Sequence, residues 1–195
     1  MTTLKPKFNL LRPLSWSQIS SFEWNPEDWY SRYILGEKQA ETGPLIFGKK
    51  IGERLATDLA FLPEVPRYKH MEKKFIGKIG DIELIGFLDS FCPNTLSILE
   101  FKTSSNKNRW NQKKAEEHGQ LSFYCLLVWL NHGKLPEKCH LCYLPCRETG
   151  SFDIELTGEP VQIFEVKKTA VDVLKFGNYI KDVRKKMIKY AEEHK

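Results

Sequence analysis

The feature that most constrains the fold is a pair of apolar segments separated by a short turn. Residues 82–89 and 96–102 are rich in isoleucine, leucine and phenylalanine. Pro93 and Asn94 lie between them and favour a turn, so the two segments are predicted to form an antiparallel pair of strands. Each segment ends in charged residues, and an unpaired charge is costly where it emerges from a buried sheet. The strand ends are therefore the first place to look for a site.

The charged residues at these strand ends are Asp89, Glu100 and Lys102. Because side chains alternate across a strand, Glu100 and Lys102 are expected on one face, while Phe101 points to the other. Asp89 can reach the first face across the hairpin. Two carboxylates and one ammonium group would then converge, and metal-dependent cleavage of a phosphodiester requires such a set. The alternative is a solvated strand edge on which Glu100 simply pairs with Lys102.

A helix predicted at residues 111–131 follows the second strand, because its apolar residues recur at near-helical spacing. Gln120 and Tyr124 are four residues apart and therefore lie on one face of that helix. We expect this face to turn towards the charged cluster. The alternative is an ordinary amphipathic helix whose Tyr124 lies in the core.

The rest of the chain predicts helices and strands without a repeat or a low-complexity linker. The expected helices are residues 17–35, 45–60, 111–131 and 160–194, and the expected strands are residues 69–76, 82–91, 96–103, 138–145 and 151–156. Pro26 is expected to interrupt the first helix and Gly36 to end it. The order predicts an α/β fold with a small mixed central sheet flanked by helices, in a single domain covering residues 1–195.

Taken together, these features resemble the PD-(D/E)XK nuclease superfamily, and specifically its RecB-like branch, which includes small CRISPR-associated exonucleases. Residues 15–26 resemble the N-terminal helix of that branch, which typically reads S-x-S-x-[LI]-x-x-F-x-x-C-P. Gly48 begins a segment similar to its G-x-x-x-H helix. The resemblance covers about residues 15–144 and implies a restriction-endonuclease-like core.

The resemblance also implies a role for each charged residue. Asp89 and Glu100 would bind Mg²⁺ or Mn²⁺, with the backbone carbonyl of Phe101 as a further ligand. Lys102 would position or activate the attacking water.

Three further residues match the family pattern. Gln120 and Tyr124 correspond to the Q-x-x-x-Y pair of the RecB-like branch, which orders the site and touches the DNA strand. Glu72 precedes the strand-ending acid, as an acidic residue commonly does in the family.

Two positions depart from the family pattern. Gly52 stands where the family has a metal-binding histidine, so we expect the neighbouring Glu53 to supply a carboxylate, with water in the vacant position as the alternative. Asn25 replaces one of the four cysteines that bind an iron–sulfur cluster in some members. Cys139 and Cys142 lie three apart on a predicted strand and would face opposite sides of the sheet. We therefore expect no iron–sulfur cluster and no structural metal at these cysteines.

The segment between the second strand and the following helix is basic. Lys107, Arg109 and Lys113 could contact phosphates, and Trp110 could stack on a base. The alternative is a solvated loop whose Trp110 anchors in the core. The formal net charge of +5 permits a phosphate-rich partner without demanding one.

The composition places the chain among ordinary globular proteins, since 41% of its residues are hydrophobic and 28% are charged. No apolar run reaches the length of a membrane span, and the first residues lack the apolar core of a signal peptide. We therefore expect a cytoplasmic protein with no membrane partner.

These expectations favour a metal-dependent DNA nuclease. The resemblance implies an exonuclease that acts on DNA ends or single strands, in DNA repair, recombination, or phage- or CRISPR-type DNA processing, with a helicase or recombination protein as a partner. The alternative is an inactive nuclease-like fold that serves as a nucleic-acid-binding or interaction module, because the family histidine is missing.

Overall fold

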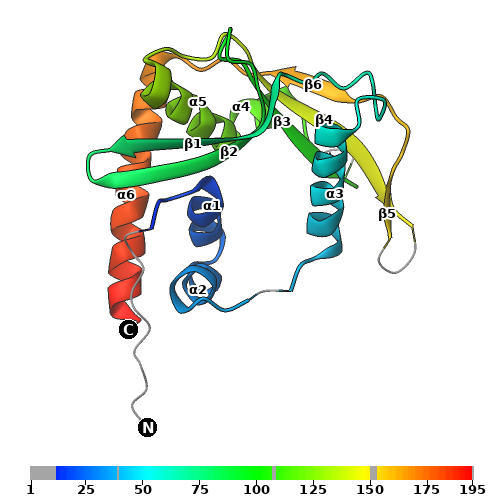
Figure 1. Cartoon of the computed structure of the whole chain (residues 1–195). Helices are drawn as coiled ribbons and strands as arrows, with labels where there is room; N and C mark the ends of the chain where they lie inside the picture. Colours follow the sequence, from blue (N-terminus) through cyan, green and yellow to red (C-terminus); the bar gives the residue numbers. More distant parts are fainter. Residues whose placement is uncertain (1–11, 39, 107–108, 150–152, 195) are drawn as a thin grey trace.

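The fold is a mixed sheet flanked by helices (Figure 1). The computed structural model describes residues 12–38, 40–106, 109–149 and 153–194. The helices are α1 (Trp16–Trp24), α2 (Pro26–Trp29), the π-helical turn η1 (Tyr30–Leu35), α3 (Gly43–Thr57), α4 (Gln112–Glu116), α5 (Gly119–His132) and α6 (Ala170–Glu193). The strands are β1 (His70–Ile79), β2 (Ile82–Phe91), β3 (Ile98–Ser104), β4 (Cys139–Glu148), β5 (Ile154–Leu156) and β6 (Gln162–Glu165).

The sheet runs in the order β1-β2-β3-β4-β5, and β6 also pairs with β4. Strands β3 and β4 are parallel, with α5 in the connection between them, and the other strand pairs are antiparallel. Figure 1 shows α6 at the left of the molecule and α3 at the right, with α1 between them. The predicted α/β fold with a small mixed sheet is confirmed.

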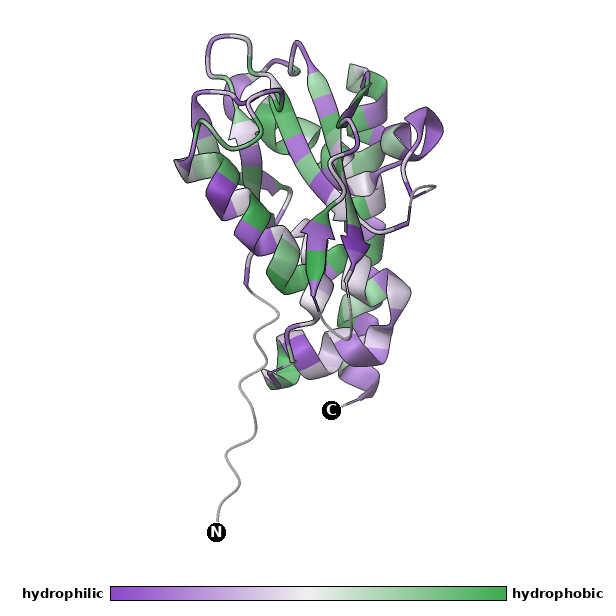
Figure 2. Cartoon of the chain, turned by 90° about the vertical axis from the view of Figure 1, so that its right-hand side faces the viewer, coloured by the Kyte–Doolittle hydropathy of each residue, from purple (hydrophilic) through white to green (hydrophobic). Residues whose placement is uncertain are grey.

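Two apolar cores lie against the sheet. In Figure 2, hydrophobic and hydrophilic residues alternate along the strands. The first core joins the sheet to α1, α5 and α6, and the second lies beneath α3. Cys139 packs in the first core and Cys142 in the second, so these two thiols face opposite sides of the sheet, as predicted. Within the described ranges, no helix combines the length and apolar character needed to cross a membrane.

The first predicted helix breaks where the sequence indicated. Asn25 is extended, and its side chain accepts hydrogen bonds from the first N–H groups of α2. Pro26 follows at the start of α2, where a missing N–H costs nothing. Gly36 ends η1 with a left-handed backbone, at a φ of 76°.

Two predicted helices differ from the structure. The prediction of one helix over residues 111–131 was wrong, because the backbone of His118 is extended and separates α4 from α5. The prediction that the last helix begins at residue 160 was also wrong. Strand β6 pairs with the free edge of β4 instead, and α6 begins only after Thr169, which forms a capping box with Asp172.

Gly86 marks a close approach of α5 to β2. A Cβ atom at this position would lie 2.6 Å from Leu127 Cδ1 and 3.2 Å from Tyr124 Cε1. We therefore expect Gly86→Ala to lower the free energy of unfolding by about 1–3 kcal/mol, because α5 must shift to admit the methyl group. Urea denaturation measures this change. Gly52→Ala is the matched control, since nothing lies within 4 Å of its added Cβ. Equal stability of the two variants would contradict the close packing.

Candidate active site

The sheet opens between β2 and β3. These strands pair at only two positions, the last of which joins Ser90 to Leu99, and then separate. In an antiparallel pair the next opposed positions are Asp89 and Glu100, so the two carboxylates face each other where the strands part. The inner edge of β2 beyond this point is partly occupied by Leu14, whose N–H and C=O bond to β2 at 2.7 and 3.0 Å.

Side chains replace the missing backbone bonds at this fork. The Phe101 N–H donates to Asp89 Oδ2 at 2.8 Å, and the Tyr124 hydroxyl donates to the Phe87 carbonyl at 2.5 Å. Because the N–H and C=O of one strand residue point the same way, the Phe101 carbonyl also faces the fork. The Phe101 ring packs in the second core beneath α3, on the opposite face from Glu100, as the alternation predicted.

A chain of hydrogen bonds runs from the carboxylates to α5. Lys102 Nζ donates to Glu100 Oε1 at 2.6 Å and to Gln120 Oε1 at 2.7 Å. Gln120 Nε2 then donates to the Tyr124 hydroxyl at 2.8 Å. The structure thus brings together Asp89, Glu100 and three residues predicted to accompany them. One of the three Lys102 N–H donors remains without an acceptor among the described residues.

The carboxylate pair is short of positive charge. Glu100 is only 2% exposed, and its Oε2 is buried without a hydrogen-bond partner among the described residues. Burial, together with the charge of Glu100, raises the pKa of Asp89 well above its usual value. Burial also raises the pKa of Glu100, although Lys102 opposes this shift. A buried carboxylate oxygen that accepts no hydrogen bond, next to a second carboxylate, fits a hard divalent ion such as Mg²⁺.

Glu72 on β1 continues the row of carboxylates formed by Asp89 on β2 and Glu100 on β3. The pairing of Met71 with Ser90 and of Lys73 with Leu88 sets Glu72 opposite Asp89. Its backbone is left-handed, with a φ of 49°, which is a strained conformation for glutamate. Burial and the charge of Asp89 raise the pKa of the Glu72 carboxyl. The family pattern indicates this acid, but the strand and helix spacings that predict the site do not reach it.

A pocket of about 860 Å³ adjoins the cluster, and both Lys102 and Gln120 line it. Its other walls come from α1, the start of α3, the end of β3 and the segment that follows β3. The cluster therefore lies beside an opening large enough to admit part of a substrate.

Comparison with known proteins places this geometry in a family. A family model of the PD-(D/E)XK nuclease superfamily matches residues 46–193. The chain belongs to this superfamily. The prediction of the superfamily from the sequence is confirmed, whereas the finer assignment to the RecB-like branch stays a prediction.

Solved structures with the same fold include a candidate exonuclease from Eubacterium rectale. It is 11% identical, with a TM-score of 0.60, over 99% of this chain and 87% of that one. A phage-related exonuclease from Haemophilus somnus is also 11% identical, with a TM-score of 0.48, over 91% of this chain and 79% of that one. A search of curated protein sequences found no match.

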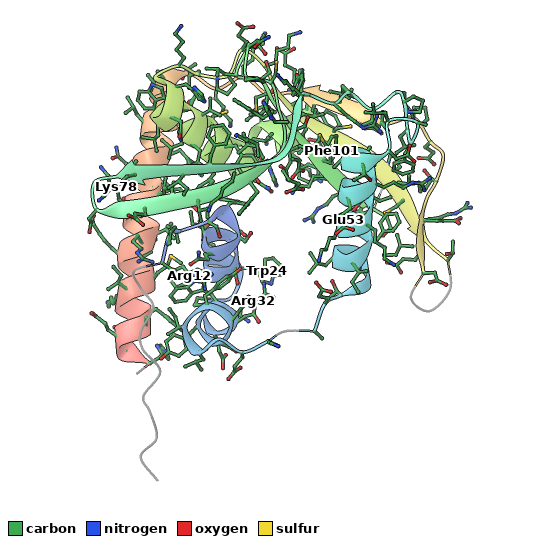
Figure 3. All side chains as sticks on the ribbon, in the orientation of Figure 1. Arg12, Trp24, Arg32, Glu53, Lys78 and Phe101 are labelled. Atoms are coloured by element: carbon green, nitrogen blue, oxygen red, sulfur yellow. The ribbon has the colours of Figure 1, made fainter. Side chains whose placement is uncertain are left out.

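The predicted metal ligands do not form a three-residue cluster within the described part of the chain. Among the described residues, no three His, Cys, Asp or Glu side chains converge as a metal site. Glu53 is exposed on α3, and Figure 3 shows it below Phe101. No contact joins Glu53 to either carboxylate, so its role as a ligand stays a prediction. Open space surrounds the position that a Cβ of Gly52 would take.

The predicted nucleic-acid-binding residues separate into three groups. Lys107 lies outside the described residues. Arg109 is exposed and lines the pocket, as does Trp110, whose half-buried ring also packs edge-on against His118 at a centroid distance of 5.0 Å. Lys113 lies on α4, away from the pocket, and forms an exposed ion pair with Glu117 at 3.9 Å. The structure thus assigns Trp110 both a packing contact and an exposed face.

Tyr124 allows a test of the hydrogen-bond chain. Tyr124→Phe would leave the Phe87 carbonyl and the Gln120 amide without their partner, so we expect the free energy of unfolding to fall by about 1–3 kcal/mol. Urea denaturation gives the value. Tyr30→Phe is the control, because the Tyr30 hydroxyl donates to the His194 carbonyl at an exposed position. A loss no larger than that of the control would show that the bond to β2 contributes little.

Proposed function

We propose that this chain is a divalent-metal-dependent DNA nuclease. The observation that carries the proposal is the Asp89–Glu100 pair at the strand fork, with Lys102 held 2.6 Å from Glu100. A solvated strand edge, the alternative weighed from the sequence, would expose these charges, whereas Glu100 is almost fully buried.

Each residue has a chemical role in this proposal. Asp89, Glu100 and the Phe101 carbonyl would hold Mg²⁺ or Mn²⁺, which supplies charge neutralisation at the phosphate and lowers the pKa of a bound water. Lys102 keeps one N–H donor for the attacking water or a phosphate oxygen. Gln120 fixes that ammonium group from α5. Glu53 is proposed as an additional metal ligand from α3.

The finer statements rest on the sequence alone. We propose that the chain is a RecB-like exonuclease acting on DNA ends or single strands in the cytoplasm. DNA repair, recombination, and phage- or CRISPR-type processing are the matching processes, and a helicase or recombination protein is the matching partner.

An inactive nuclease-like fold is the second candidate, and two observations favour it. Gly52 carries no side chain where the family has a histidine, and no three metal-binding side chains converge among the described residues. In that case the chain would bind nucleic acid without cutting it.

A cleavage assay separates the two candidates. Purified protein is incubated with end-labelled single-stranded DNA, duplex DNA or RNA, with Mg²⁺, Mn²⁺ or EDTA. We expect DNA cleavage with either metal and none with EDTA. A circular single strand that resists cleavage, beside a linear strand that is degraded, would support the exonuclease mode. Binding without cleavage under all conditions would favour the inactive fold.

A further inference from the structure

The pocket beside Lys102 has an unusual lining. Three tryptophans, six serine or threonine residues and three cationic residues line it: Trp16, Trp24, Trp110, Ser17, Ser20, Ser21, Thr103, Ser104, Ser105, Arg32, Lys102 and Arg109. None of the described residues that line it is an aspartate or glutamate, although the chain contains 25 acidic residues. The pocket therefore attracts anions and also presents flat apolar surfaces.

Helix α1 forms one wall of this pocket. Ser17, Ser20, Ser21 and Trp24 all line it, and their spacing places them on one helical face. Trp24 is 91% exposed, while the nearby Phe22 is buried in the first core. Figure 3 shows Trp24 beside α1 on the side that faces α3. A helix that buries one aromatic ring and leaves the next in the pocket provides a surface for stacking.

Two of the three cations of the pocket, Arg32 and Arg109, have no competing carboxylate among the described residues. Arg32 and Arg109 are both exposed, and neither forms an ion pair with a described acidic residue. The Arg32 guanidinium lies 5.8 Å from the centroid of the Tyr33 ring, which leaves its N–H donors available. Two guanidinium groups in one pocket, each without an ion pair to a described acidic residue, can each bind a phosphate.

We propose that this pocket binds an unpaired nucleic-acid strand and leads it to the fork, with Trp24 as the stacking platform for a base. Arg32 and Arg109 would contact the backbone phosphates, and the hydroxyl-bearing face of α1 would contact the same backbone. Only an unpaired strand fits, because a duplex hides the base faces that Trp24 would stack on. This inference rests on the proposed nuclease function and adds a specific entry path to it.

Binding without cleavage provides the test. Fluorescence anisotropy of a labelled single-stranded oligonucleotide, with EDTA present, measures affinity when no metal-dependent cleavage occurs. We expect Trp24→Ala to weaken single-strand binding by about 5- to 150-fold, the range for losing one stacked base. Trp24→Phe should retain most of the affinity, because its ring also stacks. Leu174→Ala, at an exposed apolar position on α6, should bind as the unchanged protein does.

Two further arms make the result decisive. Arg32→Gln should weaken binding and lower the slope of log affinity against log salt by about one phosphate contact. A blunt duplex of the same sequence should be insensitive to Trp24→Ala. The proposal is overturned if Trp24→Ala binds the single strand normally, if it weakens duplex binding equally, or if the unchanged protein binds no single strand. Cleavage that survives Glu100→Gln would instead refute the proposed nuclease site and leave the strand pocket standing.

Discussion

Glu100→Gln should lower the rate of DNA cleavage by about 10³-fold, a loss typical of removing one group that stabilises charge at the reacting centre. The glutamine keeps the shape of the side chain, and its oxygen can still accept from Lys102. What disappears is the negative charge that would attract a divalent ion to the fork. Asp89→Asn should cause a comparable loss, because its oxygen can still accept the Phe101 N–H while the charge is gone. Initial rates over a Mg²⁺ titration measure both variants.

The stability of the metal-free Glu100→Gln variant should rise, although its activity falls. Burial raises the pKa of both Asp89 and Glu100, so their folded state prefers a proton that the unfolded chain releases more readily. Without metal, the stability gained from that proton is present at low pH and is lost as the pH rises from the usual aspartate value of 3.8 towards the raised pKa. Glu100→Gln should therefore unfold at a higher temperature than the unchanged protein in EDTA at neutral pH, and its stability should depend less on pH.

The control for this pair of measurements is Glu83→Gln, an exposed position on the same hairpin. It should leave both cleavage and the melting temperature unchanged. A Glu100→Gln variant that cuts at the parental rate would refute the assignment of the fork as the active site. A variant that loses activity only because it unfolds would be recognised by a fall in melting temperature.

Lys102→Met should lower kcat by about 10²- to 10⁴-fold, the usual range for a group that assists proton transfer. The metal concentration at half-maximal rate should change much less, because an ammonium group cannot bind Mg²⁺ and its removal frees Glu100 Oε1 for the ion. The methionine also leaves the Gln120 carbonyl without its donor, so part of the loss reflects a less ordered α5 contact.

Comparing turnover with metal titration decides the role of Lys102. Lys78→Met, at an exposed lysine on β1, should match the unchanged protein in both. If Lys102→Met weakened metal dependence as much as it lowered turnover, the lysine would act by shaping the metal site and not by positioning the water.

The sequence predicts which residues meet at the fork better than it predicts the structure around them. Alternation along a strand is a strict local rule, so it separates Glu100 and Lys102 from Phe101 correctly. Helical spacing likewise predicts that Gln120 and Tyr124 share a face. Neither rule says that β2 and β3 part at these residues, because that depends on Leu14 and α5, which come from distant parts of the chain.

Other features depend on contacts that local patterns do not contain. Strand β6 forms because β4 has a free edge nearby, so a segment that also suited a helix start became a strand. The alignment of Glu72 with Asp89 follows from the register of β1 and not from spacing along the chain. The exposure of Trp24 was likewise not predictable, because a tryptophan in an amphipathic helix is more often part of a core.

The N-terminal contact with β2 has a consequence for the whole sheet. Strand β1 occupies one edge of β2, so the backbone bonds of Leu14 must cover the edge that faces β3. An uncovered edge in the middle of a sheet would invite either closure of β3 onto β2 or the pairing of a strand from another molecule. The residues just before α1 therefore cover this edge of β2, and shortening the chain there would endanger both the proposed active site and solubility.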